Sequence, residues 1–154
     1  MAEPWNEAAA ETVIAPFTAL EGPLLPMLHG LQGAFGCIPP EATAFLAEKL
    51  NLSRAEVHGV VSFYHDFRRT PAGRTVVKLC RAEACQAMGG DGLSQALLRR
   101  LGVDWNQTTP DGAITVAPVY CLGLCAAAPA ALIGDKPAAR LDAKTLIEKV
   151  EALR

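Results

Sequence analysis

The sequence predicts an α/β (α+β) chain in which a helical bundle precedes a small mixed sheet. Apolar residues recur at helical spacing through about the first 70 positions, and the period changes to that of strands after Pro71. Hydrophobic residues make up 51% of the chain and charged residues 19%, which are the proportions of a globular protein. The Pro71-Ala72-Gly73 break therefore predicts two domains, an N-terminal helical bundle over residues 1–72 and a sheet domain over residues 73–154.

Three helices are predicted in the first domain. One follows Pro23 and stops at Gly36, and the next follows Pro39-Pro40. The third opens at Ser53, where Glu56 three residues later has the form of a capping box. Each helix carries an apolar stripe, formed in turn by Leu24, Leu28, Leu31 and Phe35, by Phe45, Leu46 and Leu50, and by Val57, Val60, Val61 and Tyr64.

Strands and helices alternate in the second domain. Strands are predicted over 75–79 and 114–119, and a hairpin over 131–133 and 138–140 turns at Gly134-Asp135. A helix marked by Leu93, Ala96, Leu97 and Leu101 lies between the first two strands, with Asp91 placed to cap it and Gly102 just past its end; Asp142 caps a closing helix marked by Leu146, Val150 and Leu153. The order β-α-β-β-β-α is typical of a thioredoxin-like layer.

Charge and the first residues restrict the classes of function. The net charge is −2 with both signs well mixed, so no nucleic-acid partner is expected. The N-terminus lacks a basic region followed by an apolar stretch, which predicts a cytoplasmic protein without an export signal. Residues 112–134 carry no charge, but Pro118 and Pro129 would interrupt a helix there. We expect a strand, a buried loop and another strand, with no membrane insertion.

Four of the five cysteines form two pairs, Cys80 with Cys85 and Cys121 with Cys125. The pattern is C-x4-C, then 35 residues, then C-x3-C, and each pair lies where a predicted strand ends. Four soft thiolates from two loops are the ligand set that an iron–sulfur cluster requires. Gly123, inside the second pair, would let its N–H bond to a sulfur. One-electron transfer needs no proton-transfer residues, and we predict no catalytic residue on this chain.

Other interpretations of the cysteines are weaker. The rival interpretation from a different class of protein is a structural zinc module that mediates assembly. Zinc ribbons usually have two residues between paired cysteines, whereas the gaps here are four and three. Neither pair is the C-x-x-C of a dithiol site. A Rieske cluster would need histidine ligands, but His29, His58 and His65 fall on predicted helices away from both pairs.

Several further residues are expected to be structural. Cys37, between two predicted helices, is read as a small buried hydrophobe. Residues 89–92 miss both phosphate-loop patterns and are expected to turn the chain from the first cysteine loop into its helix. Arg81 and Glu83, inside the first pair, are expected to be solvated.

From about Leu24 onward the chain resembles the NuoE-like [2Fe–2S] subunits of NADH dehydrogenases and their relatives. The resemblance is carried by the residues at 31–39, 60–73, 101–111 and 112–115, and above all by Cys121 to Pro129 (CLGLCAAAP) together with the C-x4-C. Cys37 and the residues at 105–107 depart from the pattern of the family, and none of them is at a ligand position. The resemblance implies a helical bundle followed by a thioredoxin-like ferredoxin domain. It also implies one [2Fe–2S] cluster, with Cys80 and Cys85 on one iron and Cys121 and Cys125 on the other.

The resemblance also implies partners. The first is a flavoprotein subunit that carries FMN and the NAD(H) site and exchanges single electrons with the cluster. The length and the overall sequence look most like the gamma subunit of soluble NAD-dependent formate dehydrogenase, in which a larger iron–sulfur subunit carries a molybdenum cofactor. Respiratory NADH:quinone oxidoreductase and NAD-linked hydrogenase are the alternative settings. The chain shows no nucleotide loop and no molybdenum site, so alone it should oxidise neither NADH nor formate.

Overall fold

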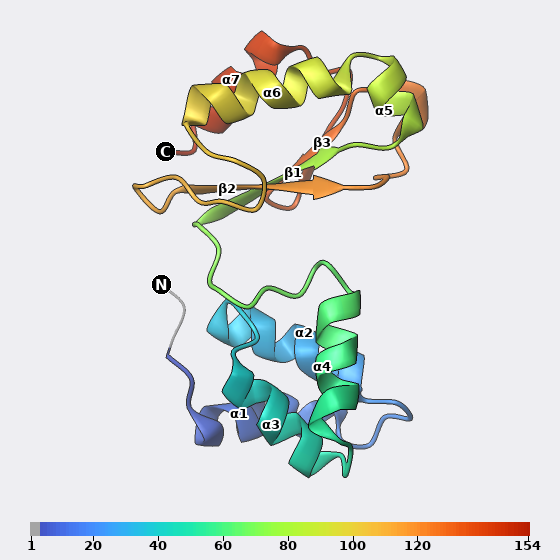
Figure 1. Ribbon diagram of the computed structural model, residues 1–154, viewed down its shortest axis with the longest axis vertical. Helices are drawn as coiled ribbons and strands as arrows, with labels where there is room; N and C mark the ends of the chain where they lie inside the picture. Colours follow the sequence, from blue (N-terminus) through green and yellow to red (C-terminus); the bar gives the residue numbers. More distant parts are fainter. Residues whose placement is uncertain (1–3) are drawn as a thin grey trace. The chain divides into compact units, whose positions relative to one another are not determined.

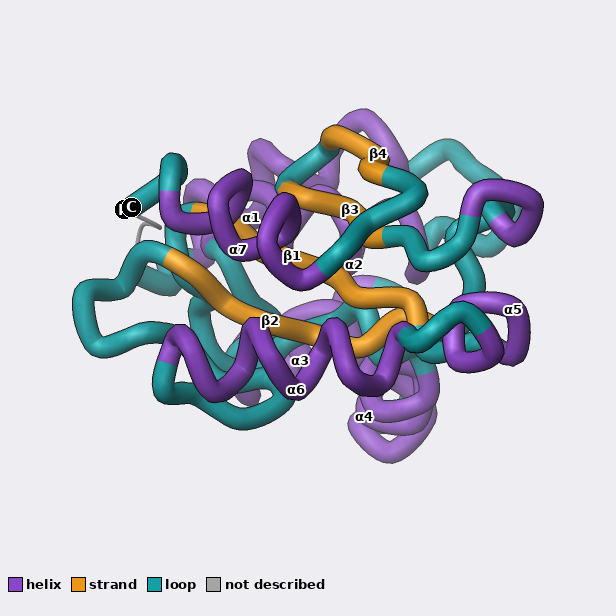
Figure 2. Tube along the Cα trace, turned by 90° about the horizontal axis from the view of Figure 1, so that it is seen from above, coloured by secondary structure: helices purple, strands orange, loops and turns teal. Residues whose placement is uncertain are grey.

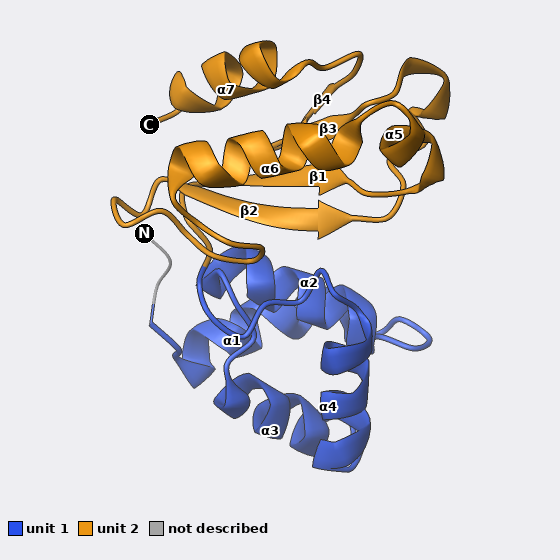
Figure 3. Ribbon diagram, turned by 45° about the horizontal axis from the view of Figure 1, so that its top comes forward, with its two compact units in different colours: residues 1–71 blue, residues 72–154 orange. Residues whose placement is uncertain are grey.

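The structure, a computed structural model, describes residues 4–154 and separates into two compact units. The first unit ends at Pro71 and the second begins at Ala72 (Figure 3). This boundary lies within the Pro71-Ala72-Gly73 break of the sequence. Each unit has its own hydrophobic core.

The first unit is helical. Its elements, in chain order, are α1 (Glu7–Ile14), the short 3-10 helix η1 (Ala15–Phe17), α2 (Leu24–Phe35), α3 (Pro40–Lys49) and α4 (Arg54–Phe63) (Figure 1). The end of α2 at Gly36 is confirmed, where the backbone turns left-handed at φ 75°. The capping box is also confirmed, because Ser53 and Glu56 exchange both bonds at the start of α4.

The core of the first unit is formed by the predicted stripes, apart from Tyr64, which is exposed, and by α1, a helix that was not predicted. The Asn6 side chain accepts hydrogen bonds from the N–H groups of Ala8 and Ala9 and so caps α1. The ring of Trp5 packs against Phe35 and Phe45, with centroids 5.1 and 5.6 Å apart. The largest fully buried side chains here are Ile14, Met27, Leu28, Leu31, Ile38, Leu46 and Val57.

The second unit is a four-stranded mixed sheet in the order β2-β1-β3-β4. Its strands are β1 (Thr75–Cys80), β2 (Ile114–Val119), β3 (Ala131–Ile133) and β4 (Lys136–Ala138). The strands β1 and β2 run parallel, from Thr75 opposite Ile114 to Cys80 opposite Val119. Figure 3 shows both arrowheads at the end of the sheet where α5 lies. The loops that follow the two strands therefore begin side by side.

Two helices cover one face of this sheet, α6 (Gly90–Leu101) and α7 (Ala143–Glu151) (Figures 1 and 2). Alternate residues of β1, Val77 and Leu79, face them and are buried. The same core takes in residues from both helices and the neighbouring strands: Leu93, Leu97, Leu101, Ile114, Val116, Ala131, Leu146 and Val150. The predicted fold class is thus confirmed.

Some details of the second unit differ from the prediction. The second hairpin strand is Lys136–Ala138, so the predicted 138–140 begins two residues late. A short helix, α5 (Glu83–Ala87), was not predicted. Asp91 is not the cap of α6, because Gly89 takes that position and Asp91 lies inside the first turn. In the first unit, His65 lies beyond the end of α4 rather than on a helix.

The charge-free stretch over 112–134 contains β2, a loop and β3, as expected. Within residues 4–154, no helix has both the length and the apolar character needed to cross a bilayer.

Candidate functional site

The four paired cysteines lie at the ends of the two parallel strands. Cys80 is the last residue of β1 and Cys85 lies on α5. Cys121 follows β2, and Cys125 begins the short 3-10 helix η2 (Cys125–Ala127). Since the carboxyl ends of neighbouring parallel strands meet at one edge of a sheet, the two pairs come together there.

Sulfur atoms approach one another in pairs. The Sγ atoms of Cys121 and Cys125 are 3.8 Å apart. Two sulfurs bound at about 2.3 Å to one tetrahedral metal are separated by roughly the same distance. Cys80 and Cys85 shift each other's pKa, and Cys80 acts electrostatically on Cys125 of the other pair. This two-plus-two arrangement fits a cluster of two irons.

The two pairs differ in their exposure. The residues of the first pair are buried, with Cys80 5% and Cys85 2% exposed. Cys121 and Cys125 are exposed, so the loop between β2 and β3 is less buried than expected. Apolar residues lie around the buried pair: Ala82, Val119, Leu122, Leu124, Ala128 and Ala130. A cluster held by all four would have one side inside the protein and one side at its surface.

Backbone N–H groups point at the sulfurs. The N–H of Gly123 donates to the Sγ of Cys121 at 3.3 Å, which confirms the expected N–H to sulfur bond at this glycine. The backbone groups of Ala82, Cys121 and Leu122 also act on the sulfur of Cys80 and lower its pKa. Such donors stabilise negative charge on sulfur and so favour bound thiolate.

The same contacts shift the thiol pKa values in opposite directions. Burial raises the pKa of Cys80, but its hydrogen bonds outweigh burial and bring the pKa below the ordinary value. Burial raises the pKa of Cys85, and its contact with Cys80 adds to this. The hydrogen bond with Cys121, and then the charge of Cys121, raise the pKa of Cys125. Within each of these pairs, one thiolate makes the second harder to form until a cation is bound.

Two backbone features shape the cysteine loops. Cys121 has φ 110° and Gly123 has φ 74°, so the second loop turns through left-handed backbone at both residues. A Cβ on Gly123 would meet no other protein atom within 4 Å, so its glycine is required by the backbone angle rather than by crowding. In the first loop, Gly89 (φ 85°) turns the chain into α6, which confirms the role expected of residues 89–92.

Gly90 and Ala130 are two site residues that sequence reasoning missed. A Cβ on Gly90 would lie 2.6 Å from the carbonyl oxygen of Cys85, so α6 can pack on the first loop only because this residue has no side chain. The backbone of Ala130 lowers the pKa of the Cys85 thiol, and the Ala130 carbonyl accepts from the N–H of Cys80 at 3.1 Å. The glycine run was a local signal for Gly90, whereas nothing in the sequence marks Ala130.

Arg81 is less solvated than expected. Its side chain is 34% exposed, and its guanidinium carbon lies 5.1 Å from the centre of the Trp105 ring. Its Nη2 is 3.7 Å from a carboxylate oxygen of Asp91 in the first turn of α6. Glu83, by contrast, is exposed as predicted.

The remaining candidate ligands lie in the first unit. Cys37 is 8% exposed, as expected of a small buried residue. His29 lies on α2, His58 on α4 and His65 just after α4, and all three are exposed. Within the part of the chain that the structure describes, no three His, Cys, Asp or Glu side chains are grouped around a position for a single metal ion.

Comparison with known proteins gives relatives along nearly the whole chain. Residues 10–154 match the family of thioredoxin-like [2Fe–2S] ferredoxins. The chain is 37% identical over 116 residues to the NADP-reducing hydrogenase subunit HndA of Solidesulfovibrio fructosivorans, covering 75% of this chain and 68% of the relative. It is 36% identical over 127 residues to a subunit of the NADH-quinone oxidoreductase of Mycobacterium bovis, covering 82% of this chain but only half of the relative.

A solved structure is also similar to this chain. The crystal structure of an NAD+-reducing [NiFe]-hydrogenase in the air-oxidised state matches with a TM-score of 0.69 and 32% sequence identity. The match covers 84% of this chain and 23% of the hydrogenase chain. The family match includes both cysteine pairs and the sheet that brings them together. On this evidence the chain belongs to the thioredoxin-like [2Fe–2S] ferredoxin family.

Proposed function

We propose that this chain is an electron-transfer subunit that holds one [2Fe–2S] cluster through Cys80, Cys85, Cys121 and Cys125. The proposal is carried by the meeting of two cysteine pairs at the ends of neighbouring parallel strands, with two sulfurs 3.8 Å apart. When bound, the cluster takes up and gives away one electron at a time. The chain supplies four thiolates, N–H donors to the sulfurs and apolar walls around the buried pair.

The proposed electron partner is the FMN of a separate NAD(H)-binding flavoprotein subunit. Two observations support it. The relatives named above are subunits of an NADH-quinone oxidoreductase and of an NADP-reducing hydrogenase. The exposed pair, Cys121 and Cys125, would leave one side of the cluster open to a docked partner.

We assign the chain to a class of complex rather than to one particular complex. The named relatives support an NADH dehydrogenase or an NAD(P)-linked hydrogenase. A formate dehydrogenase, with FMN and NAD on one partner and a molybdenum cofactor on another, remains a prediction from the sequence. Affinity purification of the chain from its own cells decides between them, because a quinone-reducing arm, a nickel–iron subunit or a molybdenum subunit would each identify the complex.

The cofactor is tested by measuring iron, acid-labile sulfide and zinc in anaerobically purified protein. We expect about two irons and two sulfides per chain, and EPR silence that changes to one S = 1/2 signal on dithionite reduction. Zinc without sulfide, even after anaerobic reconstitution, would instead support the structural zinc module.

The ligands are tested by replacing each cysteine with serine. We expect the serine variants at Cys80, Cys85, Cys121 and Cys125 to lose or distort the visible absorbance and the EPR signal, because an alkoxide is a harder ligand than a thiolate. Cys37→Ser is the matched control and should keep both signals. Loss of the cluster in the Cys37 variant, with a normal cluster in the Cys85 variant, would contradict the assignment.

A further inference from the structure

Arg81 is a cation inside the first cysteine pair, and its backbone and side chain are both held in place. Its α-carbon is one residue, about 3.8 Å, from that of the ligand Cys80. Its N–H donates to the carbonyl of Val119 at 2.8 Å, and its carbonyl accepts from the side chain of Gln86 at 2.7 Å. Val119 ends β2 two residues before Cys121, and Gln86 directly follows Cys85 on α5, so β2 and α5 together fix the backbone of Arg81.

The guanidinium of Arg81 is fixed as well. Trp105 packs against the core of the second unit and presents its ring 5.1 Å from the Arg81 guanidinium carbon, within the range of a cation–π contact. The N–H of the neighbouring Asn106 donates to Val116 of β2 at 2.7 Å, which ties this loop to the sheet. The guanidinium of Arg81 is therefore held against a ring that is itself anchored to the sheet.

The positive charge of Arg81 is only partly compensated. Asp91 is the carboxylate paired with it, at 3.7 Å, and its own side chain is 54% exposed. The buried Nε–H of Arg81 has no hydrogen-bond acceptor among residues 4–154. Asp91 therefore leaves part of the positive charge of Arg81 uncompensated, on the residue next to the ligand Cys80.

We infer that Arg81 raises the reduction potential of the cluster site, that Trp105 is the positioning residue that holds Arg81 there, and that Asp91 lowers the potential. The inference rests on the proposed function. Reduction at the site adds one electron, breaks no bond and needs no proton, so the site becomes one unit more negative. A fixed cation stabilises the reduced form and an anion destabilises it.

The test is an EPR-monitored potentiometric titration of the full chain with dithionite, using variants that change one charge at nearly constant shape. For Arg81→Gln we expect the ratio of reduced to oxidised protein at a fixed potential to fall by about threefold to tenfold, which is roughly 30 to 60 mV for a one-electron couple. For Asp91→Asn we expect a change in the opposite direction.

Two further variants separate charge from structure. Arg81→Lys keeps the charge, so it should restore most of the potential that Arg81→Gln loses. Trp105→Leu should lower the potential in the Arg81 background and leave it unchanged in the Arg81→Gln background. The matched control is Arg99→Gln, because Arg99 is exposed and lies eight residues beyond Asp91 on α6, about 12 Å along the helix. Its potential should stay within about 10 mV of the parent, since salt screens charges beyond about 8 Å.

The outcomes distinguish this inference from the proposed function. Absence of iron and sulfide in the parent protein would overturn the proposed function itself. Full cluster content in all variants, with Arg81→Gln and Asp91→Asn unshifted or shifted in the same direction, would overturn the inference alone. If Arg81→Gln fails to assemble a cluster, the Asp91→Asn variant still tests the inference, because Asp91 is half-exposed. Only an upward shift of the reduction potential in that variant supports the inference.

Discussion

At the scale of single residues, Gly90 shows how closely α6 packs against the first cysteine loop. A Cβ at this position would lie 2.6 Å from the carbonyl oxygen of Cys85 and 3.0 Å from its carbonyl carbon. These are backbone atoms of a proposed ligand, so they cannot move aside as a flexible side chain would. The position of Cys85 therefore depends on the absence of a side chain five residues later.

We predict that Gly90→Ala displaces Cys85 and lowers the iron and sulfide content at least severalfold. Gly92→Ala is the matched control, because Gly92 lies on the same helix and a Cβ there would meet nothing within 4 Å. That control should keep its cluster and gain up to about 1 kcal/mol of stability, since alanine favours the helix over glycine. Metal analysis and urea unfolding measure both effects, and equal cluster content in the two variants would contradict the close packing.

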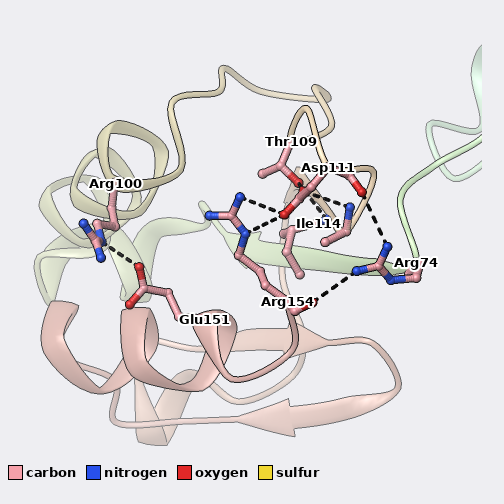
Figure 4. A network of polar contacts seen from close by, with 8 residues as sticks. Arg74, Arg100, Thr109, Asp111, Ile114, Glu151 and Arg154 are labelled. Carbon is pink, nitrogen blue, oxygen red and sulfur yellow. Dashed lines mark hydrogen bonds and ion pairs between the residues drawn. The ribbon is translucent and has the colours of Figure 1, made fainter.

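At the scale of elements, a polar network joins the end of α7 to the loop before β2 (Figure 4). Asp111 accepts from the hydroxyl of Thr109, from the N–H of Ala113 and from the guanidinium of Arg154. Arg74 donates to the backbone carbonyls of Asp111 and Arg154. Residues distant in the sequence are thus held together at one carboxylate.

The network predicts a pH dependence of stability. The hydrogen bond from Thr109, then those from Ala113 and Arg154, hold the pKa of Asp111 well below its usual range. A carboxyl whose folded pKa is lowered stabilises the fold above its unfolded pKa of about 3.9, and this stabilisation is lost as the pH falls toward the folded value.

Asp111→Asn should therefore lower the melting temperature by a few degrees at pH 7, and the difference from the parent should shrink below about pH 4. Thermal unfolding followed by circular dichroism between pH 7 and pH 3 measures this difference. Asp135→Asn, an exposed change in the β3–β4 turn, is the control and should track the parent throughout. A constant difference between Asp111→Asn and the parent at every pH would show that the charge of Asp111 contributes nothing.

For individual elements, the sequence predicts a boundary where the residue that sets the boundary acts on its own turn. Gly36 ends α2 and Ser53 opens α4 because each acts on its own turn, so both were predictable. Local reasoning misplaces β4, since Lys136 and Pro137 resemble turn residues, yet Pro137 is tolerated on an edge strand. Asp91 resembles a cap in the sequence, but the left-handed Gly89 lets α6 begin two residues earlier than a cap at Asp91 would.

The candidate site also contains features that a local sequence pattern predicts and contacts that it does not. The cysteine spacing gives the four candidate ligands, and Gly123 marks its N–H to sulfur bond within the second pair. The contact of Ala130 with Cys85 and that of Trp105 with Arg81 join residues far apart in the chain. Such contacts exist only after β1, β2 and β3 have paired, so no local sequence pattern predicts them.

At the scale of the whole molecule, the proposed ligands and the sheet that brings them together all belong to the second unit. Its core is separate from that of the helical unit. We therefore predict that residues 72–154, produced alone, fold and bind about two irons and two sulfides per chain. Circular dichroism and metal analysis test this, with the same fragment carrying Cys85→Ser as the control. A folded fragment that cannot be reconstituted would show that the helical unit is needed for the site.

The parallel pairing of β1 and β2 also has a consequence for how the protein is made. Thirty-five residues separate Cys85 from Cys121, so a ribosome adding about 5–20 residues per second releases the first pair roughly two to seven seconds before the second. During most of that interval the nascent chain offers only two of the four proposed ligands, and β1 has no parallel partner. Iron and sulfide can reach all four proposed ligands only after Cys125 has left the exit tunnel, by which point both parallel strands, β1 and β2, have been made.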